Sequence, residues 1–193
     1  MMRPIAAVLL ALMAGCARPS VKDANDRDLA RSLADPGTRQ GAIAIILASG
    51  NSKVRLLLSW SRNPPSEVDE TELDVGLAQA FGQLRTKEAI PFLIKNINLK
   101  RFVGNDAWTR APEVIEGWMP AVAALIQIGP ESSKALIRAW DRMSPDDRLG
   151  AIFVVSRIKG VPEARAFLLS ALGEANMQRR RAEEGLGFLD AQQ

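Results

Sequence analysis

The sequence predicts an all-α protein, and two observations lead to that class. Apolar residues recur at helical spacing, as at Leu73, Leu77, Ala80, Phe81 and Leu84, and almost nowhere alternate with a period of two. Similar stretches also recur along the chain, which indicates an array of helical hairpins. The chain has 193 residues, 47% apolar and 24% charged, and this composition is typical of one globular domain.

The first element is an export signal over residues 1–15. Arg3 supplies a positive charge, and the apolar run that follows, residues 5–13, is about half the length of roughly 20 residues that a bilayer-spanning helix needs. This layout predicts a secretion signal and not a permanent transmembrane anchor.

The only cysteine of the chain, Cys16, directly follows this run in the stretch Leu-Met-Ala-Gly-Cys. The stretch resembles the lipobox of bacterial lipoproteins, with Met13 at the position usually held by Leu. The resemblance implies cleavage before Cys16, diacylation of its thiol and acylation of the new amino terminus, so a palmitate-bearing anchor in the bacterial cell envelope is expected. The alternative is an ordinary signal peptide in which Cys16 is incidental.

Residues 16–25 are polar and are expected to form a short lipidated tether. In Gram-negative lipoproteins an Asp after the cysteine typically causes retention in the inner membrane. Ala17 stands there in this chain, so the resemblance favours the periplasmic face of the outer membrane.

Residues 26–193 are predicted to form the helical domain. Gly50, Gly129 and Gly160 mark helix ends, and Ser144 followed by Pro145 marks a helix start. The four predicted hairpins are 38–49 with 52–61, 71–84 with 87–97, 117–128 with 131–142, and 146–158 with 162–172.

The hairpins resemble one another in sequence. Glu88–Leu93 aligns with Glu163–Leu168, and Ser52–Trp60 aligns with Ser132–Trp140. One column of leucines runs through the second helices, at Leu56, Leu93, Leu136 and Leu168. The spacing in sequence between successive leucines of this column is typical of helical-hairpin repeats.

The segment 78–97, AQAFGQLRTKEAIPFLIKNI, resembles HEAT-like repeats. The resemblance implies a short right-handed α-solenoid of about four hairpins, whose second helices line the concave side. Residues 26–33 and 174–189 are expected to cap its two ends. Two features depart from a regular array, namely the insertion 98–116 and the helix 42–47, which is apolar on all sides.

The residue types exclude most catalytic sites. The chain has no His and no Tyr, which removes imidazole bases, His metal ligands and phenols, and its serines have no base at a suitable spacing. Acidic residues between 67 and 74 crowd a helix start, where the dipole stabilises them, and lack metal-ligand spacing. The net charge of +3 is not that of a nucleic-acid binder. We therefore expect no cofactor, no metal and no nucleic-acid partner.

The predicted second helices carry almost only basic charges beyond their first turns. These residues are Lys53, Arg55, Lys95, Lys134, Arg138 and Arg165. They form a candidate binding stripe for an acidic protein segment, a phospholipid or a lipopolysaccharide headgroup. Ordinary compensation of helix dipoles explains the same pattern without a ligand.

The insertion 98–116 is a second candidate binding surface, because long connections with aromatic residues often bind a partner. It carries Phe102 and Trp108 among polar residues, and the alternative is that both pack over helix ends. The other tryptophans stand at helical core spacing and are expected to be packing residues: Trp60, Trp118 and Trp140.

These observations lead to a non-catalytic, membrane-anchored module that binds a protein partner in the cell envelope. One alternative is a HEAT-like enzyme or small-ligand carrier, since some members of that superfamily are chromophore lyases. Another is a purely structural spacer.

Overall fold

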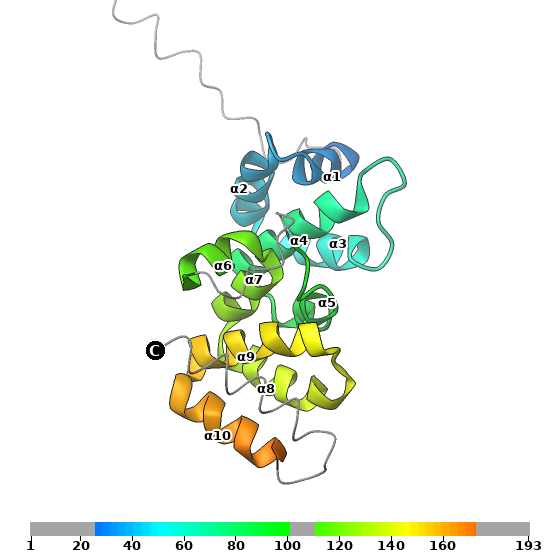
Figure 1. Ribbon diagram of the computed structural model, residues 1–193. Helices are drawn as coiled ribbons and strands as arrows, with labels where there is room; N and C mark the ends of the chain where they lie inside the picture. Colours follow the sequence, from blue (N-terminus) through cyan, green and yellow to red (C-terminus); the bar gives the residue numbers. More distant parts are fainter. Residues whose placement is uncertain (1–25, 101–110, 173–193) are drawn as a thin grey trace, which may run out of the picture.

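The computed structural model describes residues 26–100 and 111–172, and within them the protein is helical and has no strand (Figure 1). The all-α class is confirmed. The helices are α1 (Asp26–Ala34), α2 (Arg39–Ser49), α3 (Val54–Trp60), α4 (Glu70–Leu84), α5 (Ile90–Lys95), α6 (Pro112–Trp118), α7 (Pro120–Ile128), α8 (Pro130–Ala139), α9 (Pro145–Lys159) and α10 (Val161–Leu172). Three short 3₁₀ segments join or extend them: η1 (Gly50–Lys53), η2 (Lys87–Ala89) and η4 (Trp140–Arg142).

Several sequence predictions concern residues outside these ranges. They are the signal 1–15, the tether 16–25 with Cys16, the aromatic residues Phe102 and Trp108, and the cap 174–189.

The helices follow one another along an array, from α1 and α2 at one end to α10 at the other (Figure 1). Helix α4 packs against α1 and α2 and also against α7, which in turn packs against α9. Helix α5 contacts α8, and both α8 and α10 contact α9. Elements of successive predicted hairpins therefore lie side by side, and α1 packs against α2 and α4 at the first end.

The predicted leucine column occupies the core in three of the four hairpins. Leu93, Leu136 and Leu168 are fully buried, whereas in the first hairpin Leu57 is buried in place of Leu56. Helix α3 therefore presents a face one residue later than the alignment predicts.

Two glycines of α4 allow its neighbours to approach closely. A Cβ at Gly76 would lie against the carbonyl oxygen of Leu33 in α1, well inside contact distance. A Cβ at Gly82 would lie 2.8 Å from the Cα of Ala124 in α7. Real Cβ atoms do not approach backbone this closely, so glycine sets the spacing of three stacked helices.

The sequence predicts that the insertion 98–116 is a loop, and the structure differs from this prediction in its last residues. Residues 112–118 form α6, and the predicted helix 117–128 is interrupted at Met119, so that α7 begins at Pro120. The proline ring clashes with a helical residue before it, and Met119 accordingly has φ −120° and ψ 84°. Two side-chain contacts fasten this region to α9: Asn98 Nδ2 donates to Asp147 Oδ1 at 2.6 Å, and Arg157 pairs with Glu116 at 2.9 Å.

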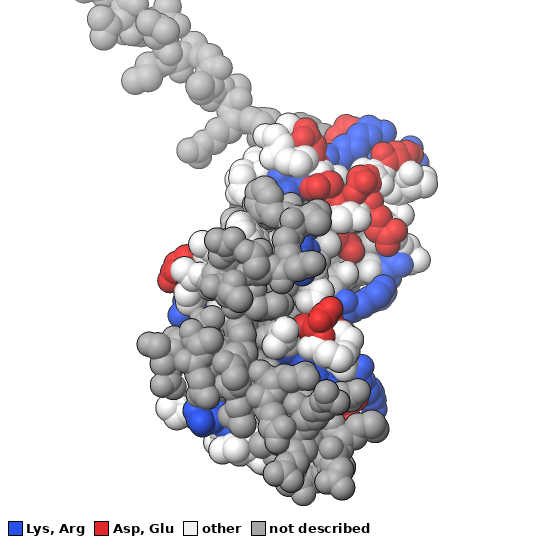
Figure 2. Space-filling view, viewed as in Figure 1, with Lys and Arg blue, Asp and Glu red and all other residues white. Residues whose placement is uncertain are grey.

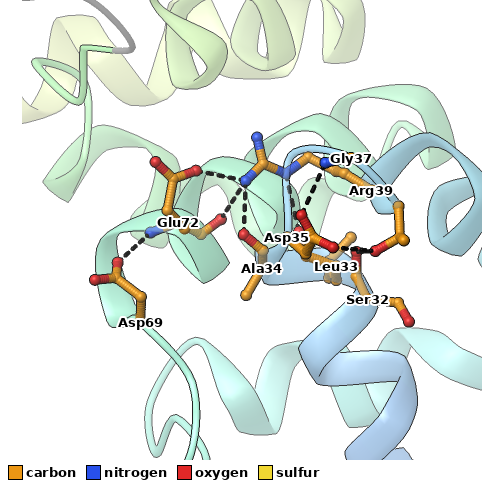
Figure 3. A network of polar contacts seen from close by, with 9 residues as sticks. Ser32, Leu33, Ala34, Asp35, Gly37, Arg39, Asp69 and Glu72 are labelled. Carbon is orange, nitrogen blue, oxygen red and sulfur yellow. Dashed lines mark hydrogen bonds and ion pairs between the residues drawn. The ribbon is translucent and has the colours of Figure 1, made fainter.

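The buried side chain of Arg39, in α2, links this helix to α1 and α4. Its Nε donates to the carbonyl oxygen of Leu33 at 2.9 Å and its Nη2 to that of Ala34 at 3.0 Å, so it caps the end of α1. The same Nη2 also pairs with the carboxylate of Glu72 in α4 (Figure 3). Arg148 of α9 acts similarly at the end of α8, since its Nε donates to the carbonyl oxygen of Trp140 at 3.1 Å.

One helical segment among the described residues, Arg39–Trp60, has the length and apolar character to cross a membrane, with a mean hydropathy of 1.3. It comprises α2, η1 and α3. Ala42, Ile43, Ile46 and Leu57 of this segment are buried in the protein core. In total, 22% of the most apolar stretch of this segment is buried inside the protein.

Candidate functional site

A hollow of about 640 Å³ opens between α3 and the turn that joins α4 to α5. Its lining combines basic, apolar and polar side chains, and we call it the basic hollow. The residues that line it are Asn51, Val54, Arg55, Leu58, Leu84, Arg85, Thr86, Lys87 and Glu88. Its volume falls within the range of roughly 300–1,000 Å³ that is usual for ligand sites.

Arg85 holds the most unusual backbone position in the hollow. It ends α4 in the left-handed region, with φ 52° and ψ 43°, and its N–H donates to the carbonyl oxygen of Gly82 at 3.0 Å. Glycine is the usual residue here, because a side chain costs about 1 kcal/mol in this conformation. Among the described residues Arg85 is the only non-glycine residue with positive φ.

The other hairpins turn through a different backbone conformation. Gly50, Gly129 and Gly160, where α2, α7 and α9 end, combine φ of 55°, 87° and 95° with ψ of −142°, −142° and 159°, a region that only glycine adopts readily. Only in the second hairpin does a cation occupy the turn position.

The hollow contains two further cations, Arg55 in the first turn of α3 and Lys87 at the start of η2. Helix dipoles favour basic residues in last turns and not in first turns, so dipole compensation does not account for Arg55. Within the described part of the chain, Arg55, Arg85 and Lys87 form no ion pair. Glu88 is the only acidic residue of the lining.

Thr86 also lines the hollow, and its side chain is buried, with 5% exposure. Its Oγ1 has no hydrogen-bond partner within the two described ranges. A buried hydroxyl without a partner is costly, at about 1–3 kcal/mol. Such a group therefore stands out in a lining that is otherwise made of charged and apolar side chains.

Lys87 also influences an acidic residue of α8. A hydrogen bond from Lys134 lowers the pKa of the Glu131 carboxyl, and the charges of Lys134, Lys87 and Arg138 lower this pKa further. Lys87 therefore lies close enough to influence a carboxylate of the third hairpin.

The structure separates the six basic residues that the sequence groups as one stripe. Only Arg55 lines the hollow. Lys53 pairs with Asp26 at 2.7 Å and Lys134 pairs with Glu131 at 3.1 Å.

The remaining three have other surroundings. Lys95 and Arg138 lie in the last turns of α5 and α8, where the dipole favours a cation. Arg165 lies half-buried in α10.

The acidic residues near the start of α4 have structural partners. The Asp69 side chain caps α4 by accepting a hydrogen bond from the Glu72 N–H at 2.8 Å, and Glu67 pairs with Arg31 at 3.6 Å. Burial and the nearby Glu70 raise the pKa of Asp74 to about 6. No group of His, Cys, Asp and Glu side chains suited to a metal occurs among the described residues.

Acidic and basic side chains occupy different regions of the visible face. Figure 2 shows acidic residues gathered over α1 and the connection into α4, and basic residues beside α3 and α5 below them. The tryptophans Trp60 and Trp140 are buried as expected, and Trp118 packs against the core. Trp140 forms an edge-to-face contact with Phe167, with ring centroids 5.2 Å apart.

Sequence reasoning found Arg55 and missed Arg85, Thr86 and Lys87. These three residues belong to a turn, whereas the search for charge followed helices. A signal was present, because the second hairpin is the only one of the four without a glycine at its turn.

No protein-family model, no curated protein and no solved structure matches the chain. The function is therefore argued from the geometry and chemistry of the basic hollow.

Proposed function

We propose that the protein is a lipid-anchored, HEAT-like right-handed α-solenoid that binds a protein partner in the bacterial cell envelope and catalyses no reaction. One observation carries the partner-binding part of the proposal. Arg55, Arg85 and Lys87 line one open hollow without an ion pair to another described residue.

A binding role explains this arrangement better than a purely structural one. Arg55 lies in the first turn of α3, where the helix dipole disfavours a cation, and unlike Lys134 it forms no ion pair with another described residue. Charges that face an open surface instead attract and orient an oppositely charged partner.

The lining offers little for catalysis. It combines cations, one carboxylate and one hydroxyl with apolar side chains, and it contains no nucleophile with an adjacent base. Binding therefore remains the activity that these residue types support best.

The anchor part of the proposal rests on Cys16. It is the only cysteine of the chain and follows an apolar run that ends in Ala-Gly. Asp26, where α1 begins, lies ten residues after Cys16, and ten residues span at most about 36 Å. Acylation at Cys16 would thus keep the array near the membrane, with the periplasmic face of the outer membrane favoured.

The test is capture of the tagged full-length protein from detergent-solubilised envelopes of its native bacterium, followed by mass spectrometry. We expect one envelope protein to be enriched at low salt and lost at high salt, because exposed charges are screened beyond about 8 Å at physiological ionic strength. A variant with Arg55→Gln, Arg85→Gly and Lys87→Gln should lose the same protein. If wild type and this variant capture the same set of proteins, the proposal is wrong.

A further inference from the structure

We infer that the basic hollow binds an acidic peptide segment that also carries an apolar side chain. This inference rests on the proposed function and specifies what part of the partner is recognised. The carboxylates would lie against Arg55, Arg85 and Lys87, and the apolar side chain against the aliphatic part of the lining.

The charge of the lining sets the sign and the minimum number of charges of the ligand. Three cations and the single acid Glu88 leave a net charge of +2 (3 − 1), so two carboxylates neutralise the site. Arginine forms two parallel hydrogen bonds to one carboxylate, which suits Asp and Glu side chains.

Arg85 holds a left-handed backbone position that a glycine would occupy at lower cost. The second hairpin instead keeps an exposed arginine at the rim of the hollow. Strained positions of this kind concentrate at functional sites.

The shape and the apolar part of the lining favour a peptide over a membrane surface. Val54, Leu58 and Leu84 supply aliphatic contacts between the cations, which a leucine-sized side chain would cover. A bilayer surface is flat on this scale and does not fill a concave site, whereas a peptide chain does. The unpartnered hydroxyl of Thr86 adds one hydrogen-bonding group, as a peptide backbone would require.

The experiment measures fluorescence anisotropy of a labelled ten-residue peptide with four Glu and two Leu, titrated with the full-length protein in neutral detergent. A matched peptide carries Gln in place of every Glu. We expect the acidic peptide to bind at least about tenfold more tightly than the Gln peptide, and its affinity to fall severalfold when salt rises from about 0.05 M to 0.3 M.

Two variants localise the binding. Arg85→Gly with Lys87→Gln should weaken binding of the acidic peptide at least about tenfold, and its melting temperature should stay or rise because Gly suits position 85. Lys159→Gln removes one exposed cation from the end of α9, outside the hollow, and should change the affinity less than twofold.

Three results would overturn the inference. They are equal binding of the acidic and Gln peptides, equal loss in the hollow and Lys159 variants, and hollow-dependent binding of phosphatidylglycerol vesicles without binding of the peptide. Each of them can occur while Cys16 is acylated and an envelope protein is still captured. Failure of the inference is therefore distinguishable from failure of the proposed function.

Discussion

Replacement of Arg39 by methionine should destabilise the protein strongly, because one guanidinium satisfies several groups at the end of α1. Its side chain is only 3% exposed. It provides the hydrogen bonds described here to the carbonyl oxygens of Leu33 and Ala34, and it pairs with Glu72. Methionine keeps most of the volume of the side chain and removes all of these bonds.

The magnitude follows from the groups left behind. Two buried carbonyls without partners cost about 1–3 kcal/mol each. The carboxylate of Glu72 is 44% exposed, so its lost ion pair adds at most about 1 kcal/mol. We therefore expect Arg39→Met to lower the free energy of unfolding by about 3–5 kcal/mol, a large part of a typical total of roughly 5–15.

Urea denaturation followed by far-ultraviolet circular dichroism measures this loss. Arg31→Met is the matched control, because Arg31 is exposed and pairs with Asp28 on the same helix. It should change the free energy of unfolding by less than about 0.5 kcal/mol. A loss below about 1 kcal/mol for Arg39→Met would refute the assignment of Arg39 as the cap of α1.

The remaining predictions concern helix spacing, pH and the anchor. Gly76→Ala should lower the melting temperature, because its Cβ would meet the backbone of Leu33, whereas Gly41→Ala, with nothing within 4 Å, should raise the stability by about 0.5–1 kcal/mol. The raised pKa of Asp74, about 6, means that the folded protein binds this proton more tightly than the unfolded chain. Its contribution to stability is therefore complete below about pH 4 and is lost as the pH rises through 6, and urea titrations of Asp74→Asn should lack this decline of about 1 kcal/mol. Cys16→Ser should abolish palmitate labelling and leave an unprocessed precursor, and normal maturation of the variant would contradict the lipoprotein assignment.

Much of the fold could be predicted because helical periodicity and repeated leucines report directly on the core. Leu93, Leu136 and Leu168 are buried as the alignment requires. The first hairpin deviates, because Leu57 is buried there in place of Leu56, and a sequence alignment does not fix which face of a helix meets the core. The break at Met119 could have been read from Pro120, since the residue before a proline avoids helical backbone.

The candidate site was less predictable from the sequence. Charge patterns along helices place Arg55 correctly but give equal weight to Lys53 and Lys134, which form ion pairs in the structure. Which cations remain without partners depends on the three-dimensional packing of the hairpins. The position of Arg85 at the hollow depends on its left-handed backbone. The sequence indicates this backbone only through the absence of a glycine at the turn.

Site-specific photo-crosslinking in intact cells tests the central claim most directly, namely that the protein binds a partner of the cell envelope at its basic hollow. A photoreactive amino acid at position 51 replaces Asn51, which lines the hollow without supplying its charge, and the same amino acid at position 159 is the control. We predict a discrete adduct with one envelope protein from position 51 and none from position 159. Identical adducts from both positions, or no adduct from position 51, would contradict the account.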